Sequence, residues 1–179
     1  MVALTRLACF FALVALCLPA LAQDNRAAEV QIKAAFLYKF GEFVQWPPAS
    51  LARDAPFVIG VLGAEDVAAA LEQVVAERTV QGRPVVVRRL RRGDSLTGLH
   101  MLFIGREESA RLAETLAGAK GQPLLTVTES DNAISHGSVI NFVAEDQKVR
   151  FDIALPPAER GQLKISSRLL AVARKVISI

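Results

Sequence analysis

The sequence contains two histidines, His100 and His136, which are its clearest candidates for acid–base or metal chemistry. They lie more than thirty residues apart, without a cysteine or an H-x-x-x-H spacing, so a metal site is poorly supported. Ser130 and Asp131 could join His136 in a hydrolase triad, but no G-x-S-x-G nucleophile elbow is present. A hydrolase therefore stays an alternative, with these two histidines as its only plausible bases, and we expect no catalytic residue, metal or cofactor.

A glycine-containing turn follows an apolar segment at residues 60–63, where a phosphate-binding loop could lie. The next residues include Glu65 and Asp66, and the corresponding later turn carries Glu107 and Glu108. Carboxylates at a helix N-terminus repel a phosphate, and neither G-x-G-x-x-G nor a Walker lysine is present. The sequence thus argues against nucleotide binding.

Four arginines within residues 88–92 form the densest charge cluster in a chain with 21 basic and 18 acidic residues. The cluster is typical of a solvated strand end, with an acidic partner surface as the alternative. No basic patch is interleaved with aromatic residues, so we expect no nucleic-acid partner.

Residues 1–22 have the pattern of a secretory signal peptide: one arginine, a 12-residue apolar run and an A-x-A-type cleavage site. We expect cleavage after Ala22, which leaves residues 23–179 as one exported domain. Both cysteines, Cys9 and Cys17, would leave with the signal, so the mature chain would have no disulfide.

Hydrophobic periodicity in the mature chain predicts two β-α-β units. A helix over residues 25–46 with a wide apolar face comes first and ends at Pro47-Pro48. The first unit then has strands at 57–62 and 84–89 around a helix at 67–75; the second has strands at 101–104 and 124–128 around a helix at 107–117.

The last third of the chain predicts a β-hairpin, with strands at 139–143 and 149–155. A terminal helix is expected from Ile165 to Val176, capped by Ser166 or Ser167. The predicted fold is α/β: a single domain with a mainly parallel central sheet, helices on both faces, a C-terminal β-hairpin and a terminal helix.

Several segments occur in a fixed order that matches the pattern of a known protein family. The opening signature is Ala34-Ala35-Phe36-Leu37-Tyr38-Lys39-Phe40 followed by Trp46-Pro47. The later matches are Ile59-Gly60-Val61-Leu62-Gly63, Gly82-Arg83-Pro84-Val85-Val86-Val87, His100-Met101-Leu102-Phe103-Ile104, Leu125-Thr126-Val127-Thr128, Val139-Ile140-Asn141-Phe142, Val149-Arg150-Phe151-Asp152-Ile153 and Leu163-Lys164-Ile165-Ser166-Ser167-Arg168.

In these segments and their order the sequence resembles the YfiR/HmsC family of small periplasmic proteins, and the resemblance implies a non-enzymatic periplasmic regulator. Such a protein would bind the periplasmic sensor region of an inner-membrane diguanylate cyclase, or another membrane sensor, and repress the cyclic di-GMP synthesis that favours biofilm formation. The resemblance also implies a homodimer and an outer-membrane lipoprotein as a possible antagonist.

For the partner contact we expect residues of the hairpin and the terminal segment: Asn141, Arg150, Asp152, Ser166, Ser167 and Arg168. The alternative function is a periplasmic small-ligand sensor or carrier. Its pocket would lie at the carboxyl ends of the parallel strands, near Phe103, Thr126 and Thr128.

Overall fold

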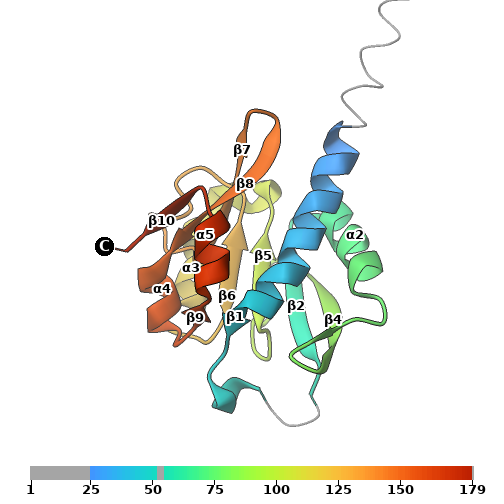
Figure 1. Ribbon diagram of the computed structural model, residues 1–179, viewed down its shortest axis with the longest axis vertical. Helices are drawn as coiled ribbons and strands as arrows, with labels where there is room; N and C mark the ends of the chain where they lie inside the picture. The colour runs from blue at the N-terminus through green and yellow to red at the C-terminus, as the bar shows by residue number, and fades with distance from the viewer. Residues whose placement is uncertain (1–24, 52–54, 179) are drawn as a thin grey trace, which may run out of the picture.

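The computed structural model describes residues 25–51 and 55–178 (Figure 1). Its strands are β1 (Val44–Gln45), β2 (Phe57–Leu62), β3 (Thr79–Val80), β4 (Arg83–Leu90), β5 (Met101–Ile104), β6 (Leu125–Thr128), β7 (Ile140–Glu145), β8 (Lys148–Ala154), β9 (Lys164–Ile165) and β10 (Lys175–Ile177). Its helices are the N-terminal helix (residues 25–43), η1 (Pro48–Ser50), α2 (Glu65–Val75), η2 (Arg106–Arg111), α3 (Leu112–Ala119), α4 (Leu155–Arg160) and α5 (Ser167–Val172).

Eight strands form one sheet in the order β10-β8-β7-β6-β5-β2-β4-β3, and β1 and β9 form a separate ribbon. Neighbouring strands of the sheet are parallel except in the β7–β8 hairpin and the β3–β4 pair. The predicted mainly parallel α/β fold with a C-terminal hairpin is therefore confirmed.

Helices cover both faces of this sheet. Successive strand residues point to opposite sides, and the apolar residues on each side pack against helices. Phe57 and Ile59 of β2 belong to the larger core, which the N-terminal helix, α2 and α5 also join. Leu102 and Ile104 of β5 point the other way, into a smaller core with α3. In Figure 1 the N-terminal helix and α5 lie in front of the sheet.

Four phenylalanines attach the N-terminal helix to the hairpin. Phe40 packs on Phe151 and Phe142 with ring centroids 5.1 and 5.7 Å apart, and Phe36 lies 5.4 Å from Phe151. Aromatic contacts of this kind add stability beyond the area that they bury. The apolar face predicted for this helix is confirmed, and it places the helix beside the hairpin.

Most predicted boundaries agree with the structure to within two residues, but three elements differ more in extent or type. The first helix ends at residue 43 and not at Trp46, because Val44 and Gln45 pair with β9. The segment predicted as a helix over 107–117 is 3-10 helix up to Arg111 and α-helix afterwards.

The predicted terminal helix is also shorter than expected. Ser166 caps α5, as predicted, by accepting a 3.3 Å hydrogen bond from the Leu169 N–H. However, α5 ends at Val172, and the chain then forms β10, which runs parallel to β8 at the sheet edge.

No helix within the described residues is long and apolar enough to cross a membrane. The predicted signal peptide, residues 1–22, lies outside the described residues.

Candidate functional site

A row of polar side chains crosses three neighbouring strands near one end of the sheet. Thr128 of β6 is in register with Asn141 of β7, which is in register with Asp152 of β8. All three side chains are buried. They lie on the sheet face opposite the N-terminal helix, because the alternating residues Phe142 and Phe151 point into the core beneath that helix.

Hydrogen bonds fix the orientation of this row. Thr128 Oγ1 lies 2.7 Å from Asn141 Oδ1, and the Ser130 N–H donates to the same oxygen at 3.2 Å. Arg174, which precedes β10, donates from Nε to Asp152 Oδ1 at 2.8 Å. The Asn141 amide nitrogen has no hydrogen-bond partner among the residues that the structure describes, so one end of this buried side chain is left open.

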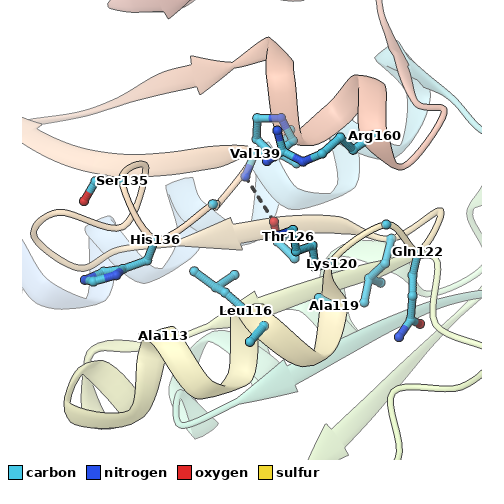
Figure 2. A pocket seen from close by; sticks show the side chains of 15 residues that line it. Ala113, Leu116, Ala119, Lys120, Gln122, Thr126, Ser135, His136, Val139 and Arg160 are labelled. Atoms are coloured by element: carbon cyan, nitrogen blue, oxygen red, sulfur yellow. Dashed lines mark hydrogen bonds between the residues drawn. The ribbon is translucent and has the colours of Figure 1, made fainter. Parts of the chain in front are cut away.

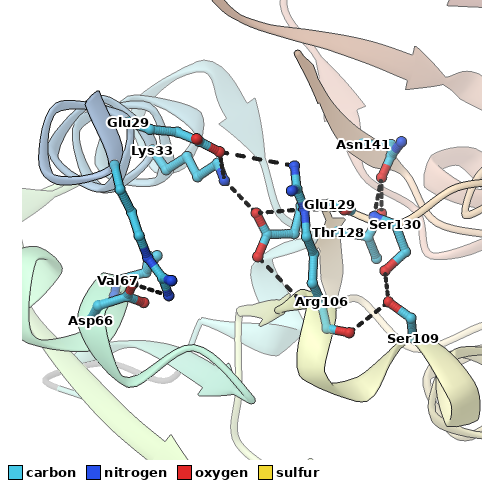
Figure 3. A network of polar contacts seen from close by, with 11 residues as sticks. Glu29, Lys33, Asp66, Val67, Arg106, Ser109, Thr128, Glu129, Ser130 and Asn141 are labelled. Carbon is cyan, nitrogen blue, oxygen red and sulfur yellow. Dashed lines mark hydrogen bonds and ion pairs between the residues drawn. The ribbon is translucent and has the colours of Figure 1, made fainter. Parts of the chain in front are cut away.

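An ion-pair network lies beside this row, at the carboxyl ends of β5 and β6 (Figure 3). Lys33, buried on the N-terminal helix, pairs with Glu29 one turn earlier and with the buried Glu129 that follows β6. The Arg106 backbone N–H, after β5, donates to Glu129 Oε1 at 3.1 Å. Glu129 thereby ties the first helix to the ends of two central strands.

Two adjoining cavities meet at this end of the sheet. One, of about 550 Å³, is lined by Asn141, Ser130, Ser109, Arg106 and Arg174 among others. The other, of about 320 Å³, lies between the N-terminal helix and the hairpin. They share the linings Arg106, Phe142, Val143 and Ala144. Ligands of open α/β sheets bind at such strand ends, so this is the candidate site.

The structure separates the six residues predicted for partner contact into two groups. Asn141, Arg150 and Asp152 lie on the hairpin face that carries the polar row. Ser166, Ser167 and Arg168 lie at the start of α5, whose Leu169 packs into the core on the opposite face.

The sequence analysis missed Lys33, Arg106, Glu129 and Arg174, and it named Ser130 only as a member of a hydrolase triad. Thr128 was named for the alternative ligand pocket, and alternation in Leu125-Thr126-Val127-Thr128 places it on the face opposite the larger core. The ion-pair partners gave no such signal, since Lys33 and Glu129 are 96 residues apart.

His100 is a structural side chain in this fold. The Val58 N–H donates to His100 Nδ1 at 3.0 Å, so Nδ1 carries no proton and Nε2 donates to the Ser50 carbonyl at 3.1 Å. Its ring also stacks on Phe57. Burial lowers the pKa of His100 below the ordinary 6.5, more than the Ser50 contact raises it, and the charge of Arg83 also lowers it.

We expect His100 to make the protein less stable as the pH falls. Because folding lowers its pKa, the unfolded chain binds the proton more readily than the folded chain. The contribution of His100 to the free energy of unfolding is therefore complete above about pH 6.5, and below that it decreases by at most about 1.4 kcal/mol per pH unit. Urea unfolding at pH 7.5 and 5.5 measures this loss. His100→Asn should reduce the loss, whereas the matched variant His136→Asn should retain it; an equal loss in wild type and His100→Asn would contradict this role.

His136 is exposed and lies at a separate pocket of about 320 Å³, with Lys120, Thr126 and Arg160 (Figure 2). Ser130 Oγ is instead 2.7 Å from Ser109 Oγ. Within the described residues, the hypothetical Ser130-Asp131-His136 triad shows no hydrogen bond that would join its members.

Three of the four arginines in residues 88–92 bind other residues of the same chain. Arg89 pairs with Glu72 at 2.8 Å and Glu65 at 2.9 Å, and Arg92 pairs with Glu108 at 2.9 Å. Arg88 donates to a carbonyl of the following loop. In residues 25–51 and 55–178, no three His, Cys, Asp or Glu side chains are grouped so as to hold a metal.

Comparison with known proteins shows similarity to one family and to solved structures. A family model described as YfiR/HmsC-like matches residues 30–174. A conserved domain protein from Vibrio cholerae O1 biovar El Tor N16961 has a similar crystal structure, with a TM-score of 0.57 and 10% identity, over 82% of this chain and 60% of that one. The chain thus spans less than two thirds of that protein, and the likeness shows a shared fold. No curated protein matches the sequence.

Proposed function

The chain belongs to the YfiR/HmsC-like family, a family of periplasmic regulators linked to diguanylate cyclase signalling, and on this basis we propose what it regulates. The protein binds the periplasmic sensor region of an inner-membrane diguanylate cyclase and represses its synthesis of cyclic di-GMP. It does so by occupying the sensor region and not by catalysis. The family match carries this proposal, because it runs from the N-terminal helix to Arg174 and includes every element of the candidate site.

The proposed function requires export of the protein to the periplasm. We propose that residues 1–22 are removed and that residues 23–179 act in the periplasm as a homodimer. An outer-membrane lipoprotein that competes for the regulator would relieve repression. Support for these points comes from the signal-like sequence and from the family.

We propose the exposed side of α5 and the neighbouring strand β10 as the docking surface. Arg168 and Val172 are one helical turn apart and share a face of α5, and Val172 is 61% exposed. Val176 on β10 is a further exposed apolar side chain, whereas the half-exposed Arg150 of β8 lies on the other face of the sheet and is not part of this surface. Exposed apolar groups beside arginines are typical of protein contact surfaces.

Binding of the protein, purified from the periplasm, to the isolated sensor region of a cyclase encoded nearby tests this proposal. We expect Arg168→Glu combined with Val172→Asp to weaken binding about 10- to 100-fold, because contact residues typically contribute about 1–3 kcal/mol. Both positions are exposed, so the melting temperature should stay the same.

Lys120→Glu is the matched control, since it reverses a charge at the C-terminal end of α3, on the other face of the sheet. Equal binding by the α5 variant and this control would reject the docking surface. A wild-type protein that binds no such sensor region at micromolar concentration would reject the proposed function itself.

A further inference from the structure

The side-chain amide nitrogen of Asn141 is a donor without a protein partner among the described residues, and it faces a cavity. The side chain is 7% exposed, and its Oδ1 accepts hydrogen bonds from Thr128 Oγ1 and the Ser130 N–H. These two donors fix which end of the amide is oxygen. Figure 3 shows the nitrogen directed away from both, and Asn141 lines the 550 Å³ cavity. Because no protein acceptor occupies this N–H group, an acceptor atom of a solute bound in the cavity could take its hydrogen bond.

Arg106 lines the same cavity and presents an accessible cation. Its side chain is 63% exposed, and its guanidinium makes one hydrogen bond within the described chain, from Nε to the Glu129 carbonyl at 3.4 Å. The nearest carboxylate oxygens, of Glu29 and Glu129, are 3.9 Å away. The terminal nitrogens of Arg106 can therefore bind another anion in the bidentate manner typical of arginine.

The acidic groups around the cavity are already bound within the chain. Glu29 and Glu129 both pair closely with Lys33 and lie only at 3.9 Å from Arg106, and Asp152 is held by two nitrogens of Arg174. Asp131 also lines the cavity, but it is exposed to solvent, where water and salt screen its charge.

We propose that this cavity binds the oxyanion of a small solute, either a carboxylate or a phosphate. The terminal nitrogens of Arg106 and the Asn141 amide each donate a hydrogen bond to an anion oxygen. The Ser109 and Ser130 hydroxyls, 2.7 Å apart, add polar groups at the same wall. Anion binding in this cavity requires only the folded chain, so it can be tested without the cyclase. Its failure would leave the proposed function unaffected.

Nitrogen–proton NMR of the labelled protein measures this binding at the atoms concerned. The side-chain amide pair of Asn141 is assigned by its loss in Asn141→Asp. Sodium acetate and sodium phosphate are titrated separately to about 20 mM at constant ionic strength, and sodium chloride serves as the blank. We expect a saturable shift of the Asn141 amide with a Kd of about 1 mM or below for one of the two anions.

Variants separate a specific site from general charge effects. Arg106→Gln should raise the Kd at least about tenfold, whereas Arg111→Gln, an exposed arginine of the same 3-10 helix that pairs with Glu114, should leave it unchanged. Saturation by acetate alone identifies a carboxylate site, and saturation by phosphate alone identifies a phosphate site. No saturable shift with either anion, or the same Kd in Arg106→Gln as in wild type, would overturn the proposal.

Discussion

Replacing Lys33 with methionine is expected to lower the free energy of unfolding by about 3–5 kcal/mol. Lys33 and Glu129 are both nearly inaccessible, with side chains 7% and 9% exposed. Without the ammonium group, the Glu129 carboxylate stays buried with one hydrogen bond, from the Arg106 N–H, and with the Arg106 guanidinium only at 3.9 Å. The loss is large because a buried charge loses its compensating partner, not because an intact buried pair contributes that much.

Urea denaturation at pH 7 measures this effect, and two variants control it. Lys33→Met combined with Glu129→Gln should recover much of the loss, since no uncompensated charge remains. Lys39→Met, on the same helix, removes an exposed lysine that pairs with Glu42, and it should change stability by less than about 1 kcal/mol. A loss in Lys33→Met no larger than that in Lys39→Met would show that the pair does not hold the helix to the sheet.

Gly105→Ala is expected to destabilise the protein by about 3 kcal/mol or more. Gly105 follows β5 and immediately precedes Arg106, in an extended conformation that any residue can adopt. A Cβ atom at this position would lie 2.1 Å from the Gly63 carbonyl oxygen, which belongs to the backbone and cannot rotate away. The end of β5 would have to separate from the turn after β2, which would also displace Arg106.

Gly118→Ala is the matched control for this prediction. Gly118 lies within α3, and an added Cβ would meet no atom within 4 Å. Alanine is a better helix former, so this variant should be more stable than wild type by about 0.5–1 kcal/mol. Thermal unfolding of both variants gives the comparison, and a Gly105→Ala protein as stable as wild type would contradict the close approach of the two turns.

The sequence predicted the central part of the fold because those strands are continuous apolar runs. Residues 57–62 and 101–104 are such runs, and both form parallel strands as expected. The helix at 67–75 was predicted equally well, from apolar residues at helical spacing.

The short elements could not be predicted, because their partners are distant in sequence. The β10 strand has only three residues and exists through pairing with β8. Ile165, Val172 and Val176 are at helical spacing, which cannot show that the helix ends at Val172. Helix α4 begins at Leu155 with Pro156-Pro157 in its first turn, a position that tolerates proline but that the sequence equally allows as a loop.

The candidate site was predicted in part. Asn141 and Asp152 were singled out from the hairpin, and the structure places both in the buried polar row. The other components depend on tertiary contacts: Lys33 comes from the first helix and Arg174 from the chain's end. Their roles could be recognised only after the fold had placed them beside Glu129 and Asp152.

The most direct test of the proposed function is cellular cyclic di-GMP in a strain that lacks this gene. The strain is complemented either with the full chain or with a chain that lacks residues 1–22. The proposal predicts that deletion raises cyclic di-GMP and that only the full, exported chain restores the original level. An unchanged level after deletion, or equal rescue by both chains, would contradict periplasmic repression of a diguanylate cyclase.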